Sequence, residues 1–249
     1  FVRSAKGMLP TPRADALMAH MQPLMENLHR VLFSPQDFSP ATAKHTFRLG
    51  MSDWSEYWLM PELLPAITRD APGVGLHVVA ADPFQVRQLL EDDVIDIAVS
   101  INKQSAGDVI SEPVMTMGVS TLWSPQQISF AGPLSIHDYI GYEHIMVSYR
   151  ESNNSEIDRQ LARQGLQRRV RYVTPNFSTF PLMLKAMPVF ATVPQGLAQR
   201  WQQHFDLRSS VTPVNYPAFT LCILRHKRRA QGPALNWLMT QLKAAIQRA

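Results

Sequence analysis

The feature that most constrains the fold of this chain is an alternation of strand-like and helix-like segments that runs along it twice. In the first half, strand patterns at 46–51, 76–80, 95–99 and 109–123 alternate with helix patterns at 54–68 and from Asp82 onward. Strands that alternate with helices are typical of a largely parallel sheet with helices on both faces. The first half is therefore predicted to be one α/β lobe.

Local signals support these assignments. Phe47, Leu49 and Met51 alternate with polar or small residues, which is the period of a strand. Ser52 then stands directly before a helical pattern, and Asp82-Pro83 combines a capping residue with a proline suited to the first helical turn.

The second half repeats this rhythm. It has strand patterns at 145–148, 170–173, 190–193 and 219–224, and helix patterns at 152–165, 177–187, from Pro194 to Trp201, and at 233–247. Two similar α/β lobes in tandem predict a hinged pair with a cleft between them.

The N-terminal segment lacks the alternation of strands and helices and has a helical pattern instead. Thr11-Pro12 predicts a helix start, and Leu17, Met21, Leu24, Leu28 and Val31 follow at spacings of 4, 3, 4 and 3. Such a stripe indicates either a helix packed on its own domain or a linker helix that dimerises. The second is favoured because the stripe precedes the α/β pattern. Residues 1–10 are expected to be the tail of a preceding module, and 33–45 a hinge.

Composition narrows the class of protein. The chain of 249 residues is 45% hydrophobic, which excludes wholesale disorder, and no apolar run approaches the roughly 18 residues of a membrane-spanning helix. The single cysteine, Cys222, excludes an internal disulfide framework. With no secretory signal in the sequence, a cytoplasmic protein is predicted.

The net charge and the charged runs constrain the function less than the composition does. The net charge is +4, and the one dense basic run, 224–229, is interpreted as a solvated loop rather than a phosphate site. The acidic run 91–93 is also expected to be solvated. Asp96, between two apolar neighbours, is expected to cap or pair locally.

No catalytic or metal constellation is evident. The eight histidines are scattered without metal-type spacing, and Cys222, inside the apolar strand pattern, is expected to be a small buried side chain. Nucleophile-elbow and phosphate-binding loop motifs are absent from the sequence. The prediction is a protein that is not an enzyme and holds no cofactor and no metal.

The remaining candidates lie where strands end. In open α/β sheets ligands bind beyond the carboxyl ends of strands, and helix N-termini offer free N–H groups suited to a carboxylate. Trp54, Tyr57, Tyr149 and Phe177 are candidates to wall an aromatic ligand. Helix capping by the hydroxyls and core packing by the aromatic side chains remain open alternatives.

Several motifs, in this order, resemble one family. Gly7-Met8, Pro10-Thr11 and Ala14 resemble the end of the winged helix-turn-helix and the start of the linker helix of LysR-type transcriptional regulators. The first effector lobe is matched by Leu59-Met60-Pro61-Glu62-Leu63-Leu64 and Ile95-Asp96-Ile97-Ala98, the second by Ala191-Thr192-Val193-Pro194. Met51-Ser52-Asp53 and Glu56 resemble the subgroup of nodulation and aromatic-catabolism regulators.

The resemblance implies a fold and a site. The fold would be two Rossmann-like subdomains with a ligand cleft between them, as in periplasmic binding proteins, preceded by a linker helix. A small effector, aromatic or carboxylate, would bind in the cleft. Carried over by position, its contacts would be Ser52, Asp53, Trp54, Ser100, Ser148, Asn176, Phe177 and Pro194. Glu151 would repel an anionic ligand, and Asp53 and Glu56 would do the same if they lie near the cleft.

The resemblance also implies partners and boundaries. The protein would form homo-oligomers, dimers or tetramers, and reach promoter DNA only through a separate N-terminal winged helix. Residues 1–10 would be the remnant of that domain, 11–45 the linker helix and hinge, 46–116 plus 222–249 the first subdomain, and 117–221 the second. The lobes would close about the strands near Thr116 and Leu221. A transport solute-binding protein of the same fold and a two-lobed α/β enzyme remain the alternatives.

Overall fold

The computed structural model describes residues 1–4, 7–33, 38–101, 107–130, 132–150 and 155–249, which form two compact units, 1–38 and 39–249. The first unit holds two short antiparallel strands, β1 (Val2–Ser4) and β2 (Gly7–Leu9), followed by the long helix α1 (Pro12–Phe33). The predicted start of this helix is confirmed, since the Thr11 hydroxyl accepts the N–H of Ala14 at 3.2 Å.

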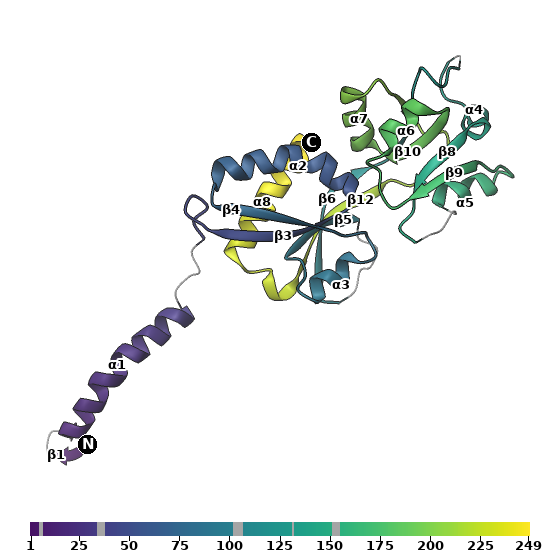
Figure 1. Cartoon of the computed structure of the whole chain (residues 1–249). Coiled ribbons are helices and arrows are strands. Elements are labelled where there is room, and N and C mark those ends of the chain that lie inside the picture. Colours follow the sequence, from purple (N-terminus) through teal and green to yellow (C-terminus); the bar gives the residue numbers. More distant parts are fainter. Residues whose placement is uncertain (5–6, 34–37, 102–106, 131, 151–154) are drawn as a thin grey trace. The chain divides into compact units, whose positions relative to one another are not determined.

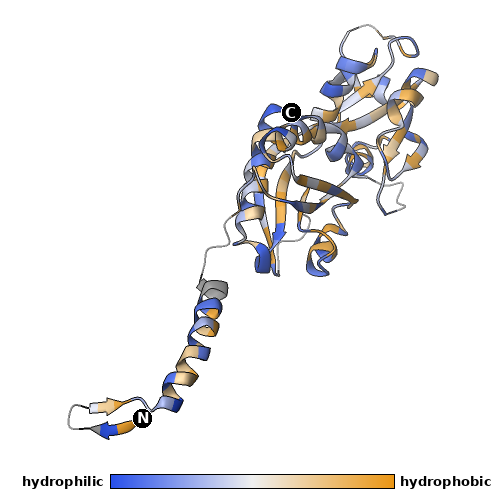
Figure 2. Cartoon of the chain, turned by 60° about the vertical axis from the view of Figure 1, so that its left-hand side comes forward, coloured by the Kyte–Doolittle hydropathy of each residue, from blue (hydrophilic) through white to orange (hydrophobic). Residues whose placement is uncertain are grey.

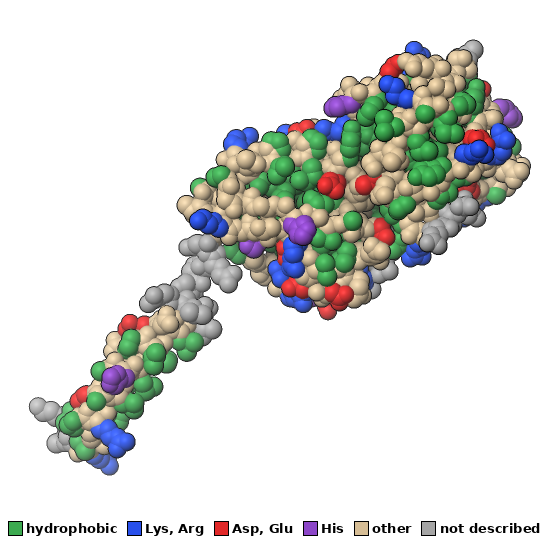
Figure 3. All heavy atoms as spheres, in the orientation of Figure 1, with side chains coloured by type: hydrophobic (Ala, Val, Ile, Leu, Met, Phe, Trp, Pro, Cys, Tyr) green, Lys and Arg blue, Asp and Glu red, His purple; other side chains and the backbone are tan. Residues whose placement is uncertain are grey.

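Helix α1 leaves its apolar stripe exposed. Leu17, Met21, Leu24 and Leu28 are each between 42% and 70% exposed, and Figure 3 shows apolar side chains along this helix. The helix runs on through Pro23 as one element. The side chains of Val31 and Leu32, which extend the predicted stripe, lie outside the described residues.

The first lobe is built on a five-stranded sheet in the order β4-β3-β5-β12-β6 (Figure 1). Its strands are β3 (His45–Met51), β4 (Val74–Ala80), β5 (Ile97–Ile101), β6 (Val109–Met117) and β12 (Phe219–His226). Its helices are α2 (Asp53–Asp70), α3 (Val86–Glu91) and α8 (Pro233–Arg248), with the short 3-10 turn η1 (Lys227–Arg229).

Alternating side chains fill both faces of this sheet. Phe47 on β3 is buried and stacks on Trp237 of α8, with ring centroids 6.3 Å apart. On the opposite face, Cys222 joins the apolar cluster that α3 covers, which confirms its prediction as a small buried side chain. Gly50 faces the same cluster, and a Cβ there would lie 2.5 Å from Ile95 Cδ1, so a larger residue at position 50 would displace the Ile95 side chain.

The second lobe repeats this plan. Its sheet has the order β11-β7-β10-β8-β9, formed by β7 (Val119–Trp123), β8 (Glu143–Val147), β9 (Arg169–Thr174), β10 (Val189–Pro194) and β11 (Arg208–Val211). Its helices are α4 (Ile136–Gly141), α5 (Glu156–Ala162), α6 (Phe180–Ala186) and α7 (Gln195–His204). Figure 2 shows the hydrophobic colouring along the strands of both sheets.

The structure refines the predicted sheet type. In each sheet four strands run in one direction and a single strand, β12 in the first and β7 in the second, runs against its two neighbours, so both sheets are mixed. The antiparallel strand is the one that the chain enters when it crosses between lobes, because β6 leads into β7 and β11 returns into β12. Beside each other at this crossing, the hydroxyls of Thr116 and Thr220 lie 3.5 Å apart. The subdomain boundaries near 116 and 221 stay predictions.

Other differences are local. Asp82 Oδ1 accepts the N–H groups of Phe84 at 2.6 Å and Gln85 at 3.0 Å, so it holds a turn and α3 begins only at Val86. Helix α6 likewise begins at Phe180 rather than at Phe177. Helix α4 and strands β1, β2 and β11 were not predicted from the sequence. The predicted helix start at 152 lies outside the described residues.

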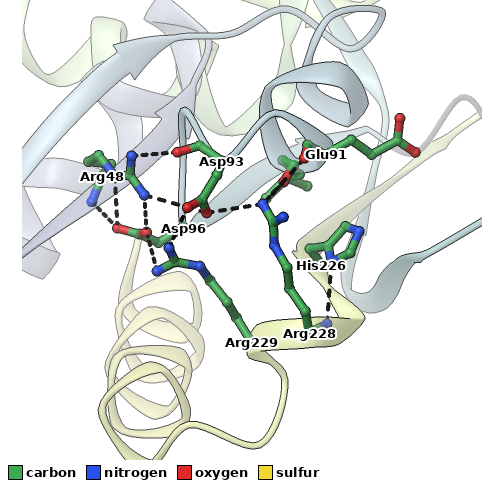
Figure 4. Close-up of polar contacts among 8 residues, drawn as sticks. Arg48, Glu91, Asp93, Asp96, His226, Arg228 and Arg229 are labelled. Atoms are coloured by element: carbon green, nitrogen blue, oxygen red, sulfur yellow. Dashed lines mark hydrogen bonds and ion pairs between the residues drawn. The ribbon is translucent and has the colours of Figure 1, made fainter.

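The basic and acidic runs meet in one ion-pair network, although Asp92, Lys227 and Arg228 stay exposed as the prediction of solvated runs requires. Asp96, 5% exposed, accepts Nη2 of Arg48 at 2.7 Å and Nη1 of Arg229 at 2.9 Å (Figure 4). Asp93, in the left-handed conformation at φ 61°, pairs with Arg229 at 2.7 Å and Arg228 at 3.2 Å. Asp96 therefore pairs across the fold rather than locally, and the network ties β3 and β5 to the turn after β12.

No helix among the described residues is both long enough and apolar enough to cross a membrane.

Candidate functional site

A cavity of about 420 Å³ opens between the two sheets. Its walls come from both lobes, at the ends of β5, β8 and β10 and at the starts of α2 and α5. The lining residues are Trp54, Pro83, Phe84, Ile101, Val119, Met146, Val147, Ser148, Tyr149, Arg150, Ser155, Glu156, Ile157, Arg159, Arg168, Phe177, Thr192, Val193, Pro194, Tyr216 and Phe219. This volume is within the range typical of sites for small organic ligands.

The first lobe contributes only apolar and aromatic side chains to this wall. Trp54, in the first turn of α2, packs edge-on against Phe219 of β12, with ring centroids 6.2 Å apart. Behind it lies Trp58, which is 1% exposed and whose ring centroid is 6.1 Å from that of Trp54. The aromatic wall therefore rests on a packed core, which fixes the position of the Trp54 ring.

The second lobe contributes every polar and charged lining residue. Ser148, Tyr149 and Arg150 follow the end of β8, and Thr192 lies on β10. A ligand in this cavity would meet apolar surface on one side and hydrogen-bonding groups on the other.

A buried arginine forms part of the polar wall. The side chain of Arg168 is 1% exposed, and its Nε donates to Asp158 Oδ1 at 2.7 Å. Burial alone lowers the pKa of Arg168, but the hydrogen bond that it donates to Asp158 and the charges around it raise the pKa overall. The same pairing outweighs burial at Asp158 and lowers the pKa of that carboxyl. The pair is therefore charged, and its two ions compensate each other.

This pair belongs to a polar network behind the cavity. Arg168 Nη1 donates to the Tyr139 hydroxyl at 3.2 Å, and that hydroxyl lies 2.9 Å from Thr192 Oγ1. Next to them, His144 is fully buried and its Nε2 bonds to the Tyr139 carbonyl oxygen at 2.7 Å. Burial and, second, the charge of Arg168 lower the pKa of His144 to about 3, so the imidazole is neutral.

Helix α2 of the first lobe contacts the second lobe at three positions along its length. At its start, Asp53 Oδ2 accepts the backbone N–H groups of Phe177 and Ser178. Further along, Trp58 lies against Gly196 of α7, where a Cβ would be 2.9 Å from the indole Nε1. Near the middle of the helix, Glu62 pairs with Arg200 at 3.2 Å.

Asp53 and Tyr149 lie close together between the lobes. Burial raises the pKa of Asp53, and the N–H groups of Ser178 and Phe177 oppose that rise. Burial and the Asp53 charge raise the pKa of the Tyr149 phenol, while the nearby Ser52 hydroxyl opposes the rise without reaching hydrogen-bond geometry. Asp53 Oδ1 and the Tyr149 hydroxyl are both buried with no hydrogen-bond partner among the described residues.

Two residues that line the cavity also contact each other across it. The guanidinium carbon of Arg150, in the second lobe, lies 3.5 Å from the centroid of the Phe84 ring, in the first. Such a cation–π contact favours the arrangement in which the two lobes face each other closely.

The structure brings together four of the eight predicted effector contacts. Trp54, Ser148, Phe177 and Pro194 line the cavity, whereas Ser52, Asp53, Ser100 and Asn176 are not among its lining residues. Ser100 is buried in β5, and the N–H of Asn176 bonds to Thr174 Oγ1 at 3.3 Å within its own turn. Of the four predicted aromatic wall residues, Tyr57 lies elsewhere, in a groove between α2 and α7.

Neither Asp53 nor Glu56, which would oppose an anionic ligand if they lay near the cleft, lines the cavity. Glu56 lies in the groove with Tyr57, Asp53 is engaged by two backbone N–H groups, and Glu151 lies outside the described residues.

Phe84, Arg168, Thr192 and Phe219 line the cavity but were not predicted from the sequence. Phe84 follows the Asp82 turn beyond β4, and this position at a strand end was a usable signal. The other three stand at or inside strands, where the local pattern does not distinguish them from residues facing a core or solvent.

No group of three or more histidine, cysteine or acidic side chains among the described residues is placed to hold a metal ion.

The family model described as the LysR substrate binding domain matches residues 40–247. This match spans both sheets and every lining residue of the cavity.

Individual relatives agree with this match. The HTH-type transcriptional activator NagR of Ralstonia sp is 26% identical over 238 residues, which cover 96% of this chain and 79% of NagR. Nodulation protein D 1 of Sinorhizobium fredii (strain NBRC 101917 / NGR234) is 24% identical over 96% of this chain and 74% of its own length. The regulatory domain of MexT, a transcriptional activator in Pseudomonas aeruginosa, superimposes with a TM-score of 0.73 at 27% identity, covering 82% of this chain and all of that domain.

Proposed function

This chain belongs to the LysR-type transcriptional regulators and carries their small-molecule-binding domain, and from that premise we propose that it senses a small aromatic effector in the cavity between its two sheets. The observation that carries the proposal is the unequal composition of the cavity walls. Aromatic side chains of the first lobe face hydroxyl, phenol and guanidinium groups of the second. A ring with polar substituents matches both walls.

The effector would act by holding the lobes together. Trp54 lines the cavity from one lobe and Phe177 from the other, so a ring between them would add contacts present only when the lobes are close. A ligand shifts such an equilibrium only by the difference between its affinities for the two states. Burial of its apolar surface contributes roughly 25 cal/mol per Å² to that difference.

The signal would pass to promoter DNA through the oligomer. The exposed apolar stripe of α1, centred on Leu24, matches a helix that pairs with a second copy of itself. Effector-dependent closure would then change the spacing of DNA-binding domains that precede α1, in a protein acting in the cytoplasm. The relatives are named as a transcriptional activator and a nodulation protein, and this favours a regulator over a transport binding protein.

The eight predicted contacts enter the proposal with different roles. Trp54, Ser148, Phe177 and Pro194 would touch the effector. Ser52, Asp53, Ser100 and Asn176 would act behind them, in the strand, helix start and turns that position the cavity wall.

A thermal-shift screen of this chain against aromatic acids, phenols and flavonoids, with amino acids and sugars as controls, tests the proposal. A ligand at 100 times its Kd adds about 2.7 kcal/mol of stability. The shift should vanish in Trp54→Ala and Phe177→Ala and persist in Tyr57→Ala, on the same helix as Trp54 but outside the cavity. Shifts with sugars or amino acids alone would reject an aromatic effector, and shifts that survive Trp54→Ala would reject this cavity.

A further inference from the structure

We infer that Arg168 is the specificity-determining residue of this cavity, and that it selects an effector whose ring carries an oxygen acceptor. The inference rests on the proposed function, since it names the chemistry read by the same cavity. It is carried by the position of Arg168, its burial, and the number of its N–H donors that the protein itself uses.

Arg168 combines contact with the cavity and removal from solvent. It lines the cavity, yet its side chain is 1% exposed. A hydrogen bond made by a buried charged donor contributes more than one made in water, because no solvent competes for it. A ligand oxygen that meets this guanidinium therefore gains more than it would at the cavity mouth.

The protein uses four of the five N–H donors of this guanidinium. Nε donates to Asp158 Oδ1 at 2.7 Å, Nη2 donates to Asp158 Oδ2 and to Ser155 Oγ, both at 3.1 Å, and Nη1 donates to the Tyr139 hydroxyl at 3.2 Å. Met146 Sδ, at 3.8 Å from Nη2, competes only for a donor already used. A guanidinium has five N–H donors, so one on Nη1 has no acceptor among the described residues.

The partners of Arg168 hold the guanidinium in one orientation. Asp158 binds it in the bidentate geometry that fixes the plane of the group, and Tyr139 is itself held by Thr192 at 2.9 Å. A donor fixed in this way loses little entropy when a ligand binds, so it discriminates between ligands by the presence and position of an acceptor.

The other two arginines of the cavity are placed differently. Arg159 is 58% exposed and pairs with Glu156 at 2.7 Å, so its charge is screened by solvent and already compensated. Arg150 lies over the Phe84 ring at the contact between lobes. Arg168 is therefore the arginine whose surroundings favour recognition of a single oxygen atom.

The two walls then orient the effector. Its ring would lie on the first-lobe side, near Trp54 and Phe219, and its oxygen on the second-lobe side, near Arg168. A carboxylate and a phenolic hydroxyl both supply the required acceptor, and the experiment compares them directly.

The test measures ligand discrimination rather than affinity alone. Binding of benzoate, phenol and fluorobenzene, a ring of similar size without oxygen, is measured by calorimetry for the wild type, Arg168→Lys and the control Arg171→Lys, which lies on β9 outside the cavity and is 65% exposed. We expect the wild type and Arg171→Lys to prefer an oxygen-bearing probe over fluorobenzene by at least about 10-fold. In Arg168→Lys the preference should fall below about 3-fold, since lysine keeps the charge but loses the planar fork.

The outcomes separate a recognition role from a structural one. A purely structural Arg168 would lower the three affinities together and leave their ratios unchanged, which would overturn the inference. Retention of the preference in a folded Arg168→Lys would overturn it as well. If no probe binds the wild type, the inference is overturned, while the proposed function is judged separately by the thermal-shift screen.

A measurement on the wild type covers the case in which Arg168→Lys does not fold. In protein labelled with ¹⁵N-arginine, a guanidinium that is 1% exposed should give side-chain N–H signals protected from exchange with water. Benzoate or phenol should shift these protected signals and fluorobenzene should leave them in place. Equal responses to all three probes would contradict the inference.

Discussion

Asp53 in the first lobe accepts the backbone N–H of Ser178 in the second at 3.0 Å, although the two residues are 125 positions apart in the sequence. The same carboxylate oxygen accepts the N–H of Phe177. Since Trp54 and Phe177 both line the cavity, this side chain joins the two walls directly behind their aromatic rings.

Replacement of Asp53 by alanine should therefore release the 177–178 turn from the first lobe. Hydrogen bonds to a charged group contribute about 1.5–3 kcal/mol, so amide exchange at Phe177 and Ser178 should become roughly 10-fold to 100-fold faster. Hydrogen exchange followed by mass spectrometry on peptides covering 175–180 measures this. Glu56→Ala, one turn further along α2, is the control that should leave these peptides unchanged. Unaltered exchange in Asp53→Ala would show that the bond does not hold the lobes.

Asp96 should be a principal determinant of the stability of the first lobe. Its carboxylate is 5% exposed and pairs with Arg48 and Arg229, and loss of one partner of a buried ion pair costs about 3–5 kcal/mol. Because both arginines are partly exposed, we expect Asp96→Ala to lower the free energy of unfolding by about 3 kcal/mol, the lower end of that range, as measured by urea denaturation.

Asp92→Asn provides the control for this loss, because Asp92 is exposed and belongs to the acidic run. It should change the free energy of unfolding by less than about 0.5 kcal/mol. Burial raises the pKa of Asp96, but the bonds and charges of Arg48 outweigh it and the pKa is lowered overall. The stabilisation by Asp96 should therefore disappear only as the pH falls below its ordinary pKa of 3.8. If the Asp96→Ala variant is as stable as Asp92→Asn, Asp96 is not a principal determinant of stability.

His144 should make the protein less stable in mild acid. The pKa of His144 is about 3 in the folded chain, against an ordinary value of 6.5. Below pH 6.5, His144 is therefore protonated in the unfolded state but stays neutral in the folded state. The loss is about 1.4 kcal/mol per pH unit, or roughly 2 kcal/mol between pH 6.5 and pH 5.

Denaturation of His144→Gln at both pH values measures this contribution. The variant should lack that part of the pH dependence, whereas His77→Gln, at an exposed position on β4, should retain it. Identical pH profiles for His144→Gln and the wild type would contradict the assignment.

The stripe on α1 should mediate self-association. Leu24 is 70% exposed at its centre, and a charge at a seam position opposes the pairing of two helices. Leu24→Glu should shift sedimentation velocity profiles toward smaller species, while Ala19→Glu, which adds the same charge on the opposite face, should not. Equal sedimentation of the two variants would argue against pairing through this stripe.

Much of the fold was predictable because its signals are local. The alternation of Phe47, Leu49 and Met51, and the cap at Thr11, depend only on neighbouring residues, and the structure confirms both elements. Helix α4 was missed because its six residues are too few to show a helical period. The single antiparallel strand of each sheet was not predicted, because its direction depends on where the chain crosses between lobes.

The cavity was only half predictable for a related reason. Trp54 and Phe177 stand directly after the positions where strands end, and such positions converge in any open α/β sheet. Arg168 precedes β9 without any motif, and its role depends on Asp158 and Tyr139, which approach it only in the folded lobe.

The sequence by itself determined the order of the elements, the two-lobed plan and the aromatic character of one cavity wall, because periodicity and capping act over a few residues. The tertiary structure decided how charges and hydrogen bonds are used. Asp96 pairs with Arg229 from 133 positions away, and Asp53 joins the lobes rather than repelling a ligand. Such pairings minimise the free energy of burying charge, and their partners are chosen by packing, which no local pattern encodes.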